Sequence, residues 1–274
     1  MIYIIKSEFL KLKRFHILFI GLIGMTLPAI LSIFTQTVAT PEAQVQNYDF
    51  TVFFSNTIWN DATIFMPVIF TLIGGYIINR EFTDHTLKII LPIPISFRRL
   101  LLGKLLTMGI LSILFGFYSF IVTLVIGSIT GVSGFGIAMF FKCLMQILGI
   151  SFCIYLSVLP IIAFTGQRPG FFIGGVIVSF LFGYSSMFIK DETIRSLYPI
   201  LSGLTIIGFD TKTYMNTSAP GNLLLSLASL AAVVLLTVGI TLLANPIETA
   251  AKSKSHKPNS RFLRRGQKGE NYKH

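Results

Sequence analysis

The stretch Asn79–Lys104, with the sequence NREFTDHTLKIILPIPISFRRLLLGK, is the one long polar-to-amphipathic segment between two strongly apolar runs. It carries eight ionisable side chains, whereas the runs on either side carry almost none. Because proline cannot continue a helix, Pro92 and Pro94 predict a short helix over Glu81–Leu91, a turn, and a second helix capped by Ser96. We expect this segment to lie at one surface of a membrane protein, stiffly joined to a spanning helix on each side.

Composition places the chain among membrane proteins. Of its 274 residues, 53% are hydrophobic and only 12% are charged, against about 25% charged residues in soluble domains. Several apolar runs approach the length of about 20 residues that a spanning helix needs. The net charge of +11 does not indicate nucleic acid, because the basic residues lie at the ends of the runs and in one tail.

The sequence predicts an all-α membrane protein with three parts. Residues 1–16 are expected to form an amphipathic interfacial helix, with an extension of the first span as the alternative. Residues 17–244 are expected to hold six transmembrane helices, and residues 245–274 a basic cytoplasmic tail. Leu197–Phe209 is too short to span and predicts a re-entrant or interfacial segment. The six spans are expected at 17–35, 62–78, 105–127, 138–164, 171–189 and 222–244.

The distribution of lysine and arginine predicts the orientation. With six spans, eighteen of the 22 lysines and arginines fall on the side of both termini and four fall on the other side. Cytoplasmic loops carry the excess of positive residues, so both termini are expected in the cytoplasm. The basic residues expected to anchor at lipid headgroups on that side are Lys13, Arg14, Arg98, Arg99 and Lys104.

Few polar groups are predicted on the other side or inside the bundle. Gln36–Asn60 is polar and nearly free of basic residues, so we expect an outside loop. Asp61 opens the second run, where an acid is expected to cap the helix rather than to contact a substrate or an ion. Gln146 lies inside the fourth run and is expected to form hydrogen bonds between helices.

The central segment carries a family resemblance. The residues that carry it are Arg80-Glu81-Phe82, Thr86-Leu87-Lys88, Pro92 to Pro94, Ser96, Arg98-Arg99 and Lys104, which together resemble the cytoplasmic loop of ABC-2-type transporter permeases. The loop looks most like that of the bacitracin-resistance and lantibiotic-immunity branch. The resemblance implies a coupling helix that sits in a cleft of the ATPase subunit, with Glu81, Thr86, Leu87 and Lys88 at the contact.

The same resemblance implies a bacterial cell-membrane exporter for an antimicrobial peptide or a similar amphiphile. Two permease subunits, identical or related, would pair with two cytoplasmic ATPase chains. This chain has no G-x-x-x-x-G-K-[ST] phosphate loop, so ATP and Mg²⁺ are expected on the separate ATPase chain, with no cofactor or metal here. No substrate-binding residue can be assigned from the sequence.

Other functions remain open at this point. An intramembrane hydrolase needs a nucleophile with its base, or metal ligands, at membrane depth, whereas all four histidines lie at interfaces or in the tail. An ion-coupled carrier usually keeps ionisable residues at mid-membrane, and the sequence places none there. A non-transporting subunit of a sensor complex could use the same loop. From the residues alone, that loop is a lever that moves both spans or a plain connection that holds them in register.

Overall fold

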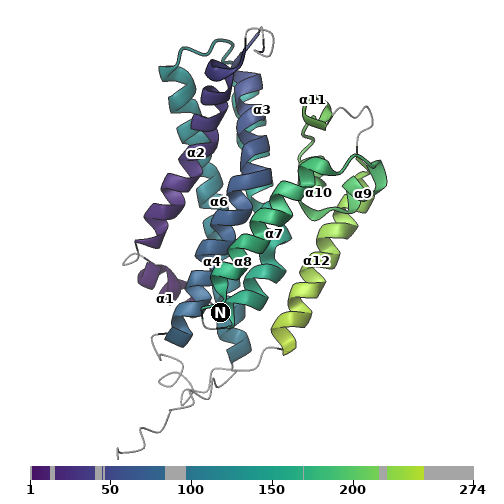
Figure 1. The fold of residues 1–274 in the computed structure, drawn as a ribbon. Helices are drawn as coiled ribbons and strands as arrows, with labels where there is room; N and C mark the ends of the chain where they lie inside the picture. The colour runs from purple at the N-terminus through teal and green to yellow at the C-terminus, as the bar shows by residue number, and fades with distance from the viewer. Residues whose placement is uncertain are drawn as a thin grey trace, which may run out of the picture.

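The computed structural model describes residues 2–12, 16–40, 45, 47–83, 97–168, 170–215 and 221–243. Within these residues all regular structure is helical and no β-strand forms, as the sequence predicts. The long helices stand side by side along one direction (Figure 1). The predicted cytoplasmic tail and most of the connection between the second and third runs lie outside the described residues.

The helices follow the chain in a simple order, with two short irregular turns, η1 and η2, that continue neighbouring helices. Their bounds are α1 (Ile2–Leu12), α2 (Ile17–Val38), α3 (Phe50–Asn60), η1 (Asp61–Phe65), α4 (Met66–Thr83), α6 (Phe97–Ile129), α7 (Ile137–Gly166), α8 (Phe172–Ser185), η2 (Ser186–Phe188), α9 (Glu192–Leu197), α10 (Pro199–Ile206), α11 (Lys212–Met215) and α12 (Leu223–Leu243).

Five helices in the described part of the chain are long and apolar enough to cross a membrane. They are Ile17–Val38, Phe50–Arg80, Phe97–Ile129, Ile137–Gly166 and Leu223–Leu243. The predicted span at 171–189 forms the shorter apolar helix Phe172–Phe188. At a rise of 1.5 Å per residue it covers about 25 Å of a hydrocarbon core of about 30 Å. The count of six spans therefore stays a prediction, because the helix Phe172–Phe188 is shorter than the others.

The second spanning helix is much longer than the sequence analysis predicts. Residues Phe50–Asn60, expected as part of an outside loop, form α3, which continues through η1 into α4. Asp49 caps this helix, because its Oδ1 accepts a hydrogen bond of 2.9 Å from the backbone N–H of Val52. The prediction that Asp61 is the N-cap is therefore wrong. The early start has a physical reason, since Phe50, Phe53 and Phe54 are buried against neighbouring helices.

Small residues allow the central helices to approach closely. A Cβ added to Gly116 of α6 would lie 2.2 Å from Ser151 Oγ of α7. A Cβ on Gly183 of α8 would lie 2.4 Å from the carbonyl oxygen of Thr63 in η1. Close backbone approach through small residues is typical of helix packing in membranes. Large apolar side chains on α2, α6, α8 and α12 are exposed on the outside of the bundle, as expected for surfaces that face lipid.

The segment before α12 forms the short helices α9, α10 and α11, of which α10 lies within the predicted apolar stretch Leu197–Phe209. Asp191 caps α9 by accepting from the N–H of Ile194 at 2.9 Å, and Pro199 begins α10. Ser229 of α12 donates to the carbonyl of Leu197 at 2.6 Å, which fastens the junction of α9 and α10 to α12. Figure 1 shows these helices, with α11, away from the end of the bundle that carries α1. Their depth in a membrane stays a prediction.

Thiol labelling of intact cells tests the predicted orientation. Cys143 and Cys153 are both buried, so the wild-type chain provides a low background. Thr213 and Arg99 are exposed near opposite ends of the bundle. We expect Thr213→Cys to react with a membrane-impermeant maleimide in intact cells, and Arg99→Cys to react only after permeabilisation. The reverse pattern would overturn the cytoplasmic placement of the termini.

Candidate functional site

The residues predicted to contact an ATPase lie in the connection between α4 and α6. Glu81 belongs to the last turns of α4, which ends at Thr83, but its side chain lies outside the described residues. Thr86, Leu87 and Lys88 also lie outside them, as do the predicted anchors Lys13 and Arg14. These six assignments stay predictions, and the described geometry of the region comes from the helix ends on either side.

The predicted headgroup anchors at the start of α6 differ in their surroundings. Arg98 and Arg99 are exposed in the first turn, where contact with lipid headgroups stays a prediction. Lys104 is different, because only 3% of its side chain is exposed and its Nζ lies 2.7 Å from Glu8 Oε2 of α1. An anchor needs an ammonium group that reaches the membrane surface, so the anchor role predicted for Lys104 is wrong. The sequence could not reveal this, because Glu8 lies 96 positions away.

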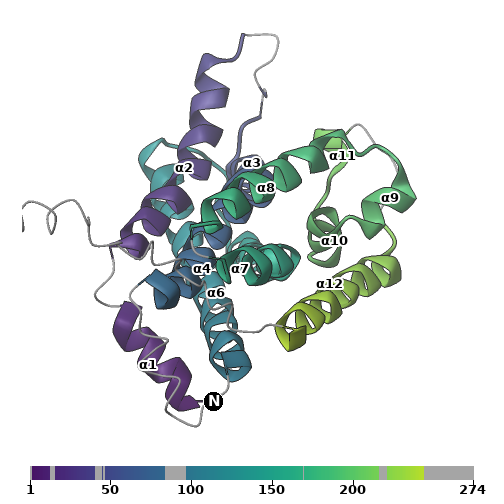
Figure 2. The same cartoon turned by 60° about the horizontal axis from the view of Figure 1, so that its bottom comes forward.

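Lys104 joins three helices at one point. Besides its ion pair with Glu8, its Nζ donates to the carbonyl oxygen of Ile77 in α4 at 3.2 Å. The Oε1 of Glu8 also accepts from Lys11 at 2.9 Å. Ile77 precedes the connection between α4 and α6, and Lys104 follows it. The two sides of this connection are therefore tied to each other and to α1, and Figure 2 shows α1 beside the N-terminal end of α6.

A second tie fastens the turn between α7 and α8 to the same region. Asn79 of α4 donates through Nδ2 to the carbonyl oxygen of Arg168 at 2.9 Å. Its Oδ1 accepts from the N–H of Gly170 at 3.4 Å, and Gly170 has a positive φ of 74° that suits glycine. We call the region of Glu8, Ile77, Asn79 and Lys104 the coupling end. Four elements meet there, namely α1, α4, α6 and the α7–α8 turn.

A buried acid lies further along the same long helix. Asp61 is fully buried, and its Oδ2 accepts a hydrogen bond of 2.9 Å from Ser119 Oγ of α6. Its Oδ1 has no hydrogen-bond partner among the described residues. Asp61 begins η1, which is a π-helical turn, and such turns inside α-helices occur frequently at functional sites. The sequence analysis missed this position because it placed Asp61 at the end of a helix.

Polar side chains of α2 and α3 lie beside this acid in sequence and space. Asn60 Nδ2 donates to Ser32 Oγ at 3.2 Å, and Ser32 Oγ donates to the carbonyl oxygen of Pro28 at 2.8 Å. Thr57 Oγ1 is 3.4 Å from Ser32 Oγ. Hydrogen bonds of this kind hold helices together where water is absent. They join α2 to α3 next to the point where Asp61 joins η1 to α6.

Residues 4–186 match the family model described as ABC-2 family transporter protein. The chain belongs to the ABC-2 transporter family. No curated protein and no solved structure matches the chain.

The family match covers the coupling end as well as Asp61 and Ser119. Membrane proteins of the ABC-2 family are transport components that are not catalytic themselves and generally work with a cytoplasmic ATPase. The chain is therefore an ABC-2 permease. In the described part of the chain, no three His, Cys, Asp or Glu side chains gather in a way that could hold a metal ion.

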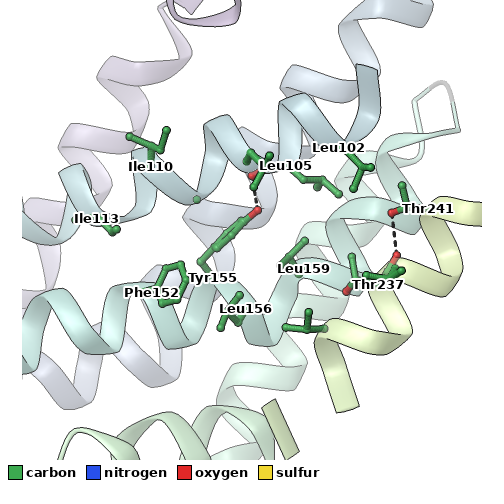
Figure 3. Close-up of a pocket in the computed structure, with 14 residues that line it drawn as sticks. Leu102, Leu105, Ile110, Ile113, Phe152, Tyr155, Leu156, Leu159, Thr237 and Thr241 are labelled. Carbon is green, nitrogen blue, oxygen red and sulfur yellow. Dashed lines mark hydrogen bonds between the residues drawn. The ribbon is translucent and has the colours of Figure 1, made fainter. Parts of the chain in front are cut away.

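The ABC-2 permease also has an apolar pocket between α6, α7 and α12. It has a volume of about 370 Å³, and apolar side chains such as Leu105, Ile110 and Leu156 dominate its lining (Figure 3). Tyr155 points across it, and its hydroxyl donates to the carbonyl oxygen of Leu105 (Figure 3). With that hydroxyl satisfied and no charged side chain in the lining, the pocket suits a hydrocarbon group.

The ion pair at the coupling end can be tested by a double-mutant cycle. Among the described residues, Lys104→Met leaves the buried Glu8 carboxylate with Lys11 as its charge partner, so we expect a loss of about 3 kcal/mol in the free energy of unfolding. Glu8→Leu combined with Lys104→Met removes both charges and is expected to be less destabilised than Lys104→Met alone. Denaturation of the purified permease in detergent measures this, with Arg99→Met, which removes an exposed charge from α6, as the control. Strictly additive losses would contradict the coupling between the two residues.

Proposed function

We propose that this ABC-2 permease is the membrane subunit of an ATP-driven exporter that expels an antimicrobial peptide or a similar amphiphile. The observation that carries the proposal is the buried contact of Lys104 with Glu8 and with the carbonyl oxygen of Ile77. This contact lies at both sides of the connection that resembles an ATPase-docking loop. A plain connection needs no buried ion pair, which costs desolvation energy. A connection that transmits force needs rigidly joined helix ends, and the contact of Lys104 holds the ends of α4 and α6 together.

This rigid contact allows force from the ATPase on the α4–α6 connection to move several helices at once. ATP binding and hydrolysis take place on the separate ATPase chain, which pushes on the connection that includes Glu81, Thr86, Leu87 and Lys88. Because α1, α4 and α6 are joined at Lys104, they move together instead of separating. Asn79 passes the same movement to the turn that begins α8. A second permease subunit, identical or related, forms the other half of the route.

Two features support an amphiphilic substrate. The central segment resembles the loop of bacitracin-resistance and lantibiotic-immunity permeases, whose substrates are amphiphilic peptides. The apolar pocket between α6, α7 and α12 has a lining without charged side chains, so it accepts the hydrocarbon part of such a molecule. The experiments below therefore use bacitracin and nisin as probes.

One observation favours a second candidate function, an ion-coupled carrier. Carriers keep ionisable groups inside the membrane, and Asp61 is fully buried within a spanning helix with one oxygen unbonded in the described chain. The ABC-2 family membership favours the ATP-driven exporter. In that case Asp61 is a polar tie between η1 and α6, and its charge has no role in the energy source.

Co-purification tests the docking of the ATPase. Glu81→Lys reverses a charge at the predicted contact, so we expect the wild-type permease, but not this variant, to co-purify an ATP-binding subunit from its native cell. Asp210→Lys is the control, because it reverses an exposed charge far from the coupling end. Recovery of the ATPase with Glu81→Lys would contradict the role of Glu81. Absence of an ATPase from every sample would contradict the exporter.

Asp61→Asn separates the two candidate functions. The amide cannot ionise but keeps an oxygen that accepts the hydrogen bond of Ser119. For an ATP-driven exporter we expect cells with this variant to keep most of their protection against bacitracin or nisin, and protection to disappear when the ATPase is inactivated. An ion-coupled carrier predicts the opposite pair of results. A sensor subunit that does not transport would leave peptide accumulation in the cell envelope unchanged in every case.

A further inference from the structure

We propose that the pocket between α3, α7 and the Gly208–Tyr214 segment binds a short stretch of an amphipathic peptide. This inference deepens the proposed function, on which it rests, by assigning a site for the peptide. The pocket has a volume of about 720 Å³, within the range of about 300–1,000 Å³ that is common for ligand sites. It lies at the opposite end of the bundle from Lys104, because it includes the beginnings of α3 and α7.

Three walls of different origin form this peptide pocket. One wall comes from α3, one from the first turns of α7, and one from the segment that leads into α11. The polar and aromatic side chains that carry the argument are Phe54, Asn56, Lys142, Gln146, Asp210 and Tyr214. Figure 1 shows α11 near the same end of the bundle as α3. A site made from segments that are far apart in the sequence depends on the fold and not on one local motif.

Hydrogen bonds hold the third wall in place. Gln146 of α7 donates through Nε2 to the carbonyl oxygens of Ile207 at 3.4 Å and Gly208 at 3.3 Å. Gly208 has a positive φ of 64°, which glycine adopts without steric cost. Gln146 was predicted to form hydrogen bonds between helices, and it bonds instead to the end of α10 and the segment that follows it. No described residue donates to its Oε1, which can accept a hydrogen bond from a ligand.

Aromatic rings stiffen the same wall. The Tyr214 ring stacks on Trp59 with centroids 4.8 Å apart, and Phe209 lies 5.7 Å from Tyr214. The Tyr214 hydroxyl donates to Asn56 Oδ1 at 2.6 Å. Burial raises the pKa of the Tyr214 phenol, and the nearby Tyr48 adds to the effect. The phenol therefore keeps its proton at neutral pH and remains a hydrogen-bond donor.

The charges in the lining indicate a peptide more than a lipid. Lys142 on α7 and Asp210 on the third wall are both exposed, and no ion pair joins either of them to another described side chain. A polypeptide offers charges of both signs, amide groups for Asn56 and Gln146, and apolar side chains for the aromatic rings. A phosphate headgroup matches Lys142 but is repelled by Asp210. A hydrocarbon chain fits the apolar pocket between α6, α7 and α12 better.

One long helix connects the peptide pocket with the coupling end. Asn56 lines the pocket on α3, and Ile77 accepts from Lys104 on α4. Between them η1 interrupts the regular hydrogen bonding, and such turns are common causes of helix bending. A push on α4 can therefore change the position of the α3 wall relative to α7. The affinity of the pocket for a peptide can therefore change during the transport cycle.

Binding measurements on the complete permease–ATPase complex in lipid nanodiscs test the proposal. The probes are fluorescently labelled nisin and bacitracin. Lys142→Gln and Asp210→Asn each remove one charge from the lining, and Asp210→Asn keeps the oxygen that accepts from the N–H of Lys212. We expect each to weaken binding several-fold. Thr51→Trp fills the mouth from an exposed position and is expected to weaken binding more than tenfold.

Lys212→Gln is the matched control, because Lys212 is exposed in the same segment but does not line the pocket. Each variant must bind the ATPase and unfold at the wild-type temperature, since the changed residues are on the surface. Unchanged peptide affinity in the three pocket variants would overturn the site but leave the exporter intact. If Lys212→Gln weakened peptide binding as much as the pocket variants do, binding would reflect general charge attraction, and the peptide pocket would be overturned.

Two further outcomes also overturn the proposal. If Lys142→Gln alone weakens binding and phosphatidylglycerol vesicles compete with the peptide, the occupant is an anionic lipid headgroup. If neither peptide binds the wild-type complex while the ATPase still co-purifies, the peptide class is wrong although the ABC assembly stands. Because co-purification reports on the assembly independently, failure of the pocket and failure of the proposed function give different results.

Discussion

The contact of Lys104 with Glu8 and with the carbonyl oxygen of Ile77 is the constraint on which the coupling end depends. Burying two charges costs desolvation energy, which their attraction offsets only where geometry is good and further hydrogen bonds are made. Here the ammonium has a carboxylate at 2.7 Å and a carbonyl at 3.2 Å. The carboxylate has Lys11 as a second partner. The arrangement gives α1 a fixed place beside α6.

The helix Phe50–Thr83, made of α3, η1 and α4, extends the influence of that contact through the permease. With 34 residues in sequence it is about 51 Å long, which exceeds the thickness of the hydrocarbon core. It carries Ile77 near one end, Asp61 at the π-helical turn and Asn56 near the other end. Polar contacts to α6, at Lys104 and at Ser119, occur at two levels of this helix. These contacts hold the long helix against α6 at both levels.

Much of the fold follows from hydrophobic run length, and much of the site does not. The expected spans at 17–35, 105–127, 138–164 and 222–244 correspond to α2, α6, α7 and α12, because long apolar runs between charged ends have few alternatives in a membrane. The start of α3 was missed because the stretch before Asp61 contains polar residues and its phenylalanines were not recognised as buried by helix packing. Contacts such as Glu8 with Lys104 and Asn56 with Tyr214 join distant positions, which periodicity cannot reveal.

The lysines of this chain have different surroundings, although a count of positive residues treats them all alike. Lys142 is exposed at the peptide pocket, whereas Lys104 is buried and paired. The count of positive residues predicts orientation because it asks only on which side a charge stays. The role of each lysine depends instead on whether its ammonium group contacts water, lipid headgroups or a carboxylate. Lys104 meets the carboxylate of Glu8, so α1, predicted as an amphipathic interfacial helix, is also joined to α6. In the exporter that we propose, force applied at the connection after α4 reaches α1 through the ion pair of Lys104 with Glu8 and reaches Asn56 through the helix made of α3, η1 and α4. The proposed ATPase contact and the proposed peptide pocket are then joined by one set of packed helices.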